Sequence, residues 1–152
     1  MARSRVLYDA GDFGVGELLI EEDVLLWHEL PRHGLEPAGT HPLADRLSAY
    51  FSGAGGDFAD VVLDLTWCTP FQRAVVDVLR GVPRGETVTY GELAALAGHP
   101  NAQRAAGSFC AHNRFPIVVP CHRVVAAGGL GSYGSLGVDF KRRLLAMEGA
   151  EV

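Results

Sequence analysis

Residues 115–125 read Phe-Pro-Ile-Val-Val-Pro-Cys-His-Arg-Val-Val, and the rest of the chain can be organised around them. The apolar run at residues 117–119 is typical of buried backbone. Pro120 removes a backbone donor and ends that run, so Cys121 is expected at a fixed bend that emerges from packed backbone. His122 and Arg123 follow at once, and both can favour a thiolate through hydrogen bonding or charge. The stretch predicts a rigidly held, reactive cysteine.

The alternative is that Cys121 is a small core residue, which is the usual fate of a free cysteine. The neighbouring histidine alone does not exclude this. Adjacent residues of an extended segment point opposite ways, so direct contact between the Cys121 thiol and His122 is not expected. The choice between the two interpretations depends on the remainder of the chain.

Length and composition indicate a globular protein of one medium domain or two small ones, since the chain has 152 residues, 48% of them hydrophobic. No apolar run approaches the ~20 residues that cross a bilayer. The amino-terminal residues lack the apolar core of a secretory signal. The cysteines Cys68, Cys110 and Cys121 show no paired spacing, which argues against a disulfide framework. We therefore expect a cytoplasmic protein with no membrane partner.

Charge is unevenly distributed along the chain, although the total is −5. Residues 1–65 carry four basic and twelve acidic side chains, a net charge of −8. Residues 66–152 carry nine basic and six acidic side chains, a net charge of +3. Local basic charge governs affinity for nucleic acid more than the total does. The second half is therefore the part that can meet phosphate.

The first part of the chain predicts a small antiparallel αβ module. Short β-prone runs at residues 6–8, 17–20 and 24–27 are separated by glycines and an acidic turn, and a loop follows at residues 31–42. Helical spacing at residues 41–51 and alternation at residues 58–65 predict a helix and a further strand. A metal site is not predicted, because the spacings of His28, His33, His41 and Cys68 match no zinc pattern.

Helices dominate the second part. Thr69 is the predicted N-cap of a helix over residues 69–79, with Pro70 at its first position. A short helix opens at Tyr90, and after Gly-His-Pro at residues 98–100 a second helix, capped by Asn101, runs to about His112. This order resembles a helix-turn-helix, and small residues around Arg104 suit either a groove wall or close packing on a neighbouring helix.

A glycine-rich loop and a last helix end the chain. The loop at residues 126–137 lacks the spacing of a phosphate-binding P-loop. The helix over residues 138–149 is expected to turn Leu144 and Leu145 inward and the basic run at residues 141–143 outward. Glu148 lies near its carboxyl end, where an acid is unfavourable with respect to the helix dipole.

Pro-Cys-His-Arg-Val at residues 120–124, with an apolar run before it and Asn113 eight positions before the cysteine, resembles the active-site signature of the O6-alkylguanine-DNA alkyltransferases. The resemblance extends from about Thr69 to Glu148. It implies a mixed α/β (α+β) fold with an amino-terminal, ribonuclease H-like αβ module over residues 1–66. A mainly helical DNA-binding and active-site domain with a helix-turn-helix would cover residues 67–152.

The resemblance also implies a catalytic set. Cys121 matches the nucleophile that takes the alkyl group, and His122 the histidine that relays its proton through a water. Glu148 matches the carboxylate that orients this histidine, which gives the arrangement the logic of a hydrolase triad. Asn113 matches the hinge asparagine before the active-site segment. No cofactor is implied, because one strong nucleophile is sufficient for this transfer.

The DNA contacts are implied in the same way. Arg104 matches an arginine that fills the gap left by a flipped nucleotide, and Tyr90 a tyrosine beside the target phosphate. Pro116 is expected to line the base pocket and Arg123 to bind DNA. Either Gly134 or Ser135 would present a donor to O6 of the guanine.

The implied function is repair of double-stranded DNA by a single transfer of a methyl or larger alkyl group from O6-alkylguanine, and from O4-alkylthymine, to Cys121. Three alternatives stay open: a lesion-binding protein without transfer activity, a helix-turn-helix regulator, and a cysteine hydrolase that turns over repeatedly. Nothing in the sequence demands an interface between copies, so a monomer is expected.

Overall fold

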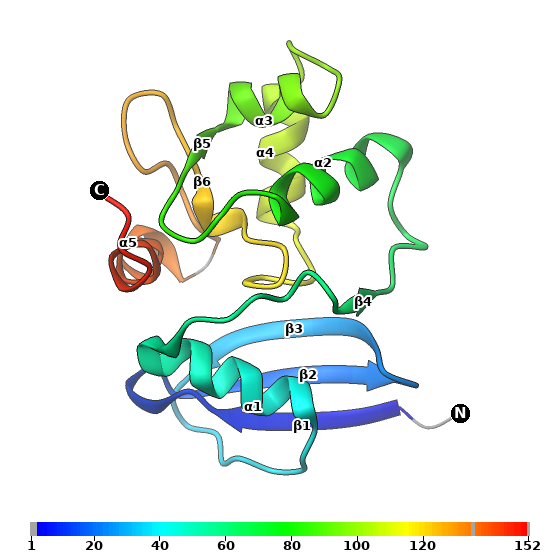
Figure 1. Cartoon of the computed structure of the whole chain (residues 1–152), viewed down its shortest axis with the longest axis vertical. Helices are drawn as coiled ribbons and strands as arrows, with labels where there is room; N and C mark the ends of the chain where they lie inside the picture. Colours follow the sequence, from blue (N-terminus) through cyan, green and yellow to red (C-terminus); the bar gives the residue numbers. More distant parts are fainter. Residues whose placement is uncertain (1–2, 135, 152) are drawn as a thin grey trace. The chain divides into compact units, whose positions relative to one another are not determined.

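A computed structural model describes residues 3–134 and 136–151 of the chain (Figure 1). The chain divides into two compact units. Unit 1 comprises the chain up to Asp64 together with Arg114–Val118, and unit 2 comprises Leu65–Asn113 together with the chain from Val119 onward. Within the described residues, no helix is both long and apolar enough to cross a membrane.

Unit 1 is built on a four-stranded sheet with the strand order β1-β2-β3-β4 (Figure 1). Strands β1 (Arg3–Asp9), β2 (Val15–Glu21) and β3 (Val24–Arg32) pair antiparallel, with the short helix η1 (Gly11–Phe13) between the first two. The predicted meander is therefore confirmed. Glu22 and Asp23 connect β2 to β3 with φ of 50° and 64°, the positive values that a two-residue hairpin turn of type I′ requires.

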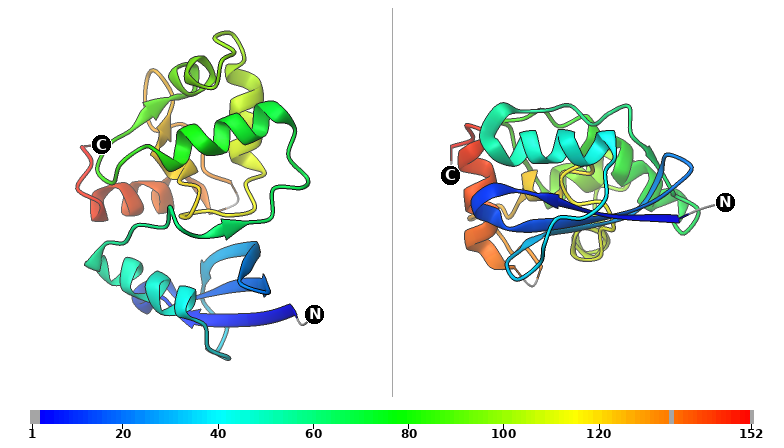
Figure 2. Two further views of the ribbon diagram at one scale, coloured as in Figure 1. Left: turned by 45° about the vertical axis from the view of Figure 1, so that its right-hand side comes forward. Right: turned by 90° about the horizontal axis from the view of Figure 1, so that it is seen from below.

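The strand predicted over residues 58–65 is shorter in the structure, where it is β4 (Val62–Leu63). This strand pairs parallel with β3. The physical reason is a turn at residues 58–61, closed by a hydrogen bond from the Val61 N–H to the Phe58 carbonyl. Helix α1 (Pro42–Ala49) and the helical turn η2 (Tyr50–Ala54) lie over one face of the sheet (Figure 2). Their apolar side chains and those of the strands form the core of unit 1.

Unit 2 begins with α2 (Pro70–Arg80), whose predicted start is confirmed. The Thr69 hydroxyl accepts from the Gln72 N–H, and the Gln72 side chain accepts from the Thr69 N–H. This reciprocal capping box satisfies two donors that a helix start leaves without an intrahelical acceptor. Val75, Val76 and Leu79 form the buried stripe of the helix.

Helices α3 (Tyr90–Leu96) and α4 (Gln103–Ala111) follow in the predicted order. The prediction that Asn101 caps the second helix is wrong, because Asn101 lies inside a turn closed by a hydrogen bond from the Ala102 N–H to the His99 carbonyl. Ala102 is the N-cap and supplies no side-chain acceptor. Whether this pair of helices binds DNA stays a prediction.

Two short strands join the helices of unit 2 to its last part. β5 (Val88–Thr89) pairs parallel with β6 (Val124–Val125), so the residues before α3 are tied to those that follow the short helix η3 (Cys121–Arg123). α5 (Gly137–Met147) ends the unit, with Glu148 as its C-cap.

Candidate active site

Cys121 begins η3 directly after a tight turn centred on Pro120. The Cys121 N–H donates to the Val119 carbonyl at 2.8 Å, and Pro120 has φ −80° and ψ 69°, the values of an inverse γ-turn. The proline ring sets φ close to this value on its own, so the expected fixed bend is confirmed. The cysteine is only 3% exposed.

Asn113 holds the Cys121 sulfur from the other side of the bend. Its side-chain amide donates to the Val119 carbonyl at 2.8 Å and to Sγ of Cys121 at 3.2 Å. One side chain thus fixes both the backbone of the turn and the thiol that follows it. A hydrogen bond of this kind is strongest to a thiolate, so it favours the ionised sulfur.

The pKa of Cys121 is nevertheless raised well above its ordinary value. Burial is the largest cause, and the hydrogen bond and charge interaction with the Cys110 thiol act in the same direction. The Asn113 amide and the positive charge of Lys141 lower the pKa of Cys121, but by less. The resting group is therefore a thiol, and its reaction as a nucleophile requires a base that accepts the proton.

His122 is a neutral imidazole, the form of histidine that can accept a proton as such a base. Its Nε2 lies 2.8 Å from Oε2 of Glu148, with both side chains fully buried. Burial lowers the pKa of His122 although Glu148 raises it, so the ring is neutral at neutral pH. Because the carboxylate can only accept, Nε2 carries the hydrogen and Nδ1 keeps its lone pair. Nδ1 has no hydrogen-bond partner among the described residues.

Arg123 balances the buried carboxylate. Its Nε donates to Oε1 of Glu148 and its Nη2 to Oε2, each at 2.9 Å, while Nη1 donates to the Val82 carbonyl at 2.7 Å. A bidentate guanidinium–carboxylate pair is among the strongest polar contacts in proteins. The awkward position of an acid at the end of α5 thus has a structural cause, since Glu148 binds both His122 and Arg123.

Comparison with known proteins places the chain in a family. Residues 70–150 match the family model described as 6-O-methylguanine DNA methyltransferase, DNA binding domain. A methylated-DNA–protein-cysteine methyltransferase of Methanothermobacter thermautotrophicus is 39% identical over 143 residues, which cover 93% of this chain and 78% of that protein. The chain belongs to the methylated-DNA–protein-cysteine methyltransferase family.

Solved structures agree with this methyltransferase assignment. The Mycobacterium tuberculosis O6-methylguanine methyltransferase has a TM-score of 0.83 to this chain at 34% identity, with 97% of this chain and 93% of that chain covered. The Mycobacterium tuberculosis OGT protein in complex with DNA has a TM-score of 0.79 at 39% identity, with 95% and 91% covered. The mixed α/β fold class expected from the sequence is therefore confirmed.

Two residues expected to contact DNA in this methyltransferase lie in unit 2. Arg104 is exposed on α4 and has no hydrogen bond or ion pair to any described residue. Tyr90 begins α3, and its half-buried ring passes close to Gly131, where an added Cβ would come within 3.3 Å of it. The glycine at this position therefore lets the glycine-rich loop approach the tyrosine ring.

The other residues predicted to contact DNA or the base are Pro116, Ser135 and Arg123. Pro116 belongs to unit 1, and Ser135 lies outside the described residues. Arg123, expected to bind DNA, has an 11% exposed side chain whose donors bind Glu148 and Val82. The DNA contact of Arg123 stays a prediction, while its contact with Glu148 was not foreseen.

Lys141 departs from the position that its sequence context predicts. It was expected to point outward, but it is fully buried, and its ammonium donates to the carbonyls of Val124 and Ser132 at 2.5 and 3.2 Å. Its charge also lies 5.9 Å from the centre of the Tyr90 ring. The spacing of residues 141, 144, 145 and 148 is that of one helix face, and this signal could have identified Lys141 as buried.

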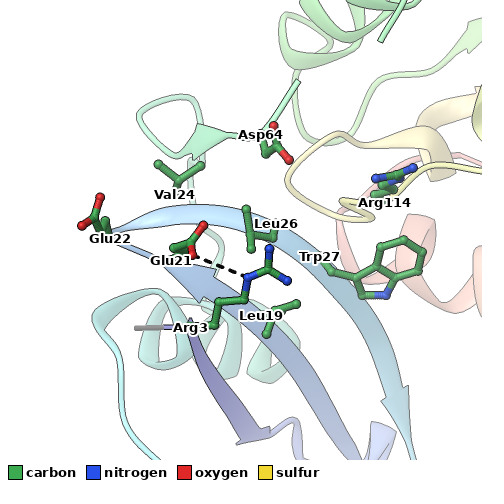
Figure 3. A pocket seen from close by; sticks show the side chains of 9 residues that line it. All are labelled: Arg3, Leu19, Glu21, Glu22, Val24, Leu26, Trp27, Asp64 and Arg114. Carbon is green, nitrogen blue, oxygen red and sulfur yellow. Dashed lines mark ion pairs between the residues drawn. The ribbon is translucent and has the colours of Figure 1, made fainter. Parts of the chain in front are cut away.

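Unit 1 contains a pocket of about 480 Å³ at one end of its sheet (Figure 3). Two arginines, three carboxylates and four apolar side chains line it: Arg3, Arg114, Glu21, Glu22, Asp64, Leu19, Val24, Leu26 and Trp27. The lining includes no cysteine or histidine, so this pocket offers no nucleophile for the family's chemistry.

Proposed function

We propose that this chain repairs double-stranded DNA by moving the alkyl group of O6-alkylguanine, and by the same chemistry that of O4-alkylthymine, onto the sulfur of Cys121. The observation that carries the proposal is the buried set of Cys121, His122 and Glu148. It combines a thiol, a neutral imidazole whose Nδ1 has no hydrogen-bond partner in the described part of the chain, and a carboxylate fixed by Arg123. The family membership of the chain supports the same reaction.

The proposed step forms one bond to the alkyl carbon, breaks another, and moves one proton from the thiol to the departing guanine. As the thiol of Cys121 loses its proton toward Nδ1 of His122, through a water as the resemblance implies, the sulfur attacks the alkyl carbon. The bond between that carbon and O6 breaks, and guanine leaves with the electron pair and takes up a proton. Glu148 stabilises the imidazolium that forms transiently, as the acid of a hydrolase triad does. The resulting thioether has no route back to a thiol, so each molecule acts once.

Recognition of the lesion is assigned to the exposed face of unit 2. Arg104 is the group proposed to enter the duplex where the flipped nucleotide was, because it is long, charged and not bound to any residue that the structure describes. Tyr90, next to the glycine-rich loop, is proposed to lie beside the target nucleotide. A monomer is sufficient for this reaction.

The test is a duplex oligonucleotide containing one O6-methylguanine, mixed with increasing amounts of protein. We expect conversion of the lesion to guanine in equal number to the protein molecules added. Cys121→Ala should bind the same duplex and leave the lesion intact. Binding without conversion by the wild type would instead indicate a lesion-binding protein, and a preference for one DNA sequence over the lesion would indicate a regulator.

A further inference from the structure

We propose that His28, with Tyr8 behind it, is a positioning residue for the active-site cysteine: it holds the segment Arg114–Val118 that leads into the Cys121 turn. The proposal rests on the proposed transfer reaction and concerns how its nucleophile is aimed. It gives unit 1, which contributes none of the predicted catalytic side chains, a specific part in that reaction.

The first step is the path of the chain. Leu65–Asn113 belong to unit 2, the next five residues belong to unit 1, and the chain re-enters unit 2 at Val119. Cys121 follows two residues later. The segment before the nucleophile is thus packed on the sheet of unit 1, while the Asn113 amide fixes the Val119 carbonyl on the other side.

The second step is the set of bonds that hold the segment. The backbone N–H of His28 donates to the Arg114 carbonyl at 2.8 Å, and Nδ1 of the same residue lies 2.6 Å from the Pro116 carbonyl. The Tyr8 hydroxyl lies 2.6 Å from Nε2. One histidine on β3 therefore binds the segment at two carbonyls.

The third step fixes the direction of these bonds. A carbonyl only accepts, so Nδ1 of His28 carries the hydrogen. Burial lowers the pKa of His28 to about 4, which keeps the ring neutral, and Nε2 must then accept from the Tyr8 hydroxyl. Every polar atom of this buried ring is satisfied in one tautomer only, as is usual for a histidine with a defined structural task.

The fourth step is the strained residue that these bonds stabilise. Ile117 has φ of 73°, a left-handed conformation that a β-branched side chain strongly disfavours. The Pro116 carbonyl belongs to the peptide plane that precedes Ile117, so a bond to that carbonyl fixes the plane from which φ of Ile117 is measured. Such strain persists only where the surrounding structure holds it, and it occurs often at functional sites.

A second contact from the same strand supports the assignment. The guanidinium of Arg114 lies 5.7 Å from the centre of the Trp27 ring, and Figure 3 shows the two side chains on the same side of the pocket of unit 1. Trp27 and His28 are consecutive residues of β3. The strand thus holds the segment at Arg114 and at Pro116, on both sides of the buried Phe115.

The experiment measures single-turnover transfer on duplex DNA with O6-methylguanine and separates the rate constant at saturation from the dissociation constant of the DNA. For His28→Leu we expect the rate constant to fall roughly tenfold to a hundredfold, since a displacement of about 1 Å at a reacting group has effects of this size. The dissociation constant should stay within about twofold of wild type, because no DNA-binding side chain is changed. Tyr8→Phe should give a smaller fall, and His28→Gln, which can donate to Pro116 and accept from Tyr8, should recover part of the rate.

Leu18→Ala is the matched control. Leu18 is fully buried on β2 directly opposite His28, so this variant destabilises the same part of the sheet while His28, Tyr8 and the segment keep their wild-type residues. Below the unfolding temperatures of all variants it should transfer at the wild-type rate. Equal slowing by Leu18→Ala, or a wild-type rate constant in His28→Leu, would overturn the positioning role. Absence of transfer by the wild type would instead overturn the proposed function.

Discussion

Arg123 binds both oxygens of Glu148, and one of those oxygens also accepts from His122. The carboxylate therefore has three donors in a site where its side chain is fully buried. A buried carboxylate must have such partners, since an unpaired charge there is strongly destabilising. Arg123 therefore has a structural role, as the partner of the buried Glu148 charge, that does not depend on any contact with DNA.

The first prediction separates the two roles of Arg123. Arg123→Met should lower the free energy of unfolding by about 3–5 kcal/mol, because it leaves the Glu148 charge buried without its guanidinium. It should also slow transfer, since His122 loses a fixed partner. If the guanidinium serves Glu148 alone, the affinity for undamaged duplex DNA should stay within about twofold of wild type. Chemical denaturation measures the free energy of unfolding, and a DNA titration measures the affinity. Weakened DNA binding with unchanged stability would show that the guanidinium binds DNA instead of Glu148.

Arg104, unlike Arg123, should affect transfer from duplex DNA without affecting the stability of the fold. Arg104→Met should leave the free energy of unfolding within about 0.5 kcal/mol, because the side chain is exposed and has no contact among the described residues. Transfer from duplex DNA should slow about tenfold, equivalent to roughly 1.4 kcal/mol of the few kcal/mol that base flipping costs. Transfer from the free base O6-methylguanine, which needs no flipping, should be unchanged. A similar loss on both substrates would contradict the intercalating role.

Lys141 should control the reactivity of the cysteine. Its charge lowers the pKa of Cys121 against the effect of burial, so Lys141→Met should raise that pKa further. Alkylation of Cys121 by iodoacetamide at neutral pH should then be slower than in the wild type, because a smaller share of the thiol is ionised. Arg142→Met, at the neighbouring exposed position of α5, is the matched control and should react as the wild type does. Equal rates in both variants would show that the Lys141 charge does not reach the sulfur.

Acid stability should depend on His28. Burial lowers its pKa from 6.5 to about 4 in the folded protein, so between these values the unfolded chain binds a proton that the folded chain does not. The free energy of unfolding should fall as the pH drops from 6.5 to 4, by roughly 3 kcal/mol from this group, and change no further because of it below pH 4. Burial lowers the pKa of His122 too. His122 therefore also lowers the free energy of unfolding as the pH drops, in the wild type and in every variant that retains it.

The comparison for this pH effect is His28→Gln, which retains hydrogen-bonding atoms but has no titratable group. Denaturation curves at pH 7, 5.5 and 4 should show a smaller loss of stability for the variant than for the wild type, with 5.5 chosen as a value roughly midway through the window. Parallel losses in the two proteins would mean that His28 does not titrate between pH 6.5 and 4.

Several of these features could be predicted from the sequence because their causes are local. Pro120 sets its own φ, so the bend before Cys121 follows from one residue type. Thr69 and Pro70 likewise determine the start of α2. The contact between His122 and Glu148 was expected only from the family resemblance, because it spans 26 residues.

The features that escaped prediction depend on contacts that leave little trace in the sequence. His28 binds a backbone carbonyl 88 residues away, and any residue at position 116 supplies a carbonyl. Lys141 was assigned to the surface because lysine is almost never buried without a partner, and its acceptors are again backbone carbonyls. Asn101 is a frequent capping residue, but the turn closed by His99 and Ala102 shifts the helix start beyond it.

The most direct test of the account is the location and number of the transferred groups. The protein is incubated with an excess of duplex DNA carrying O6-methylguanine with a labelled methyl group, and its peptides are then analysed by mass spectrometry. We predict one labelled methyl per chain, on Cys121, with no further uptake over time. A label on Cys110 or Cys68, or repeated turnover that leaves Cys121 unmodified, would contradict the account.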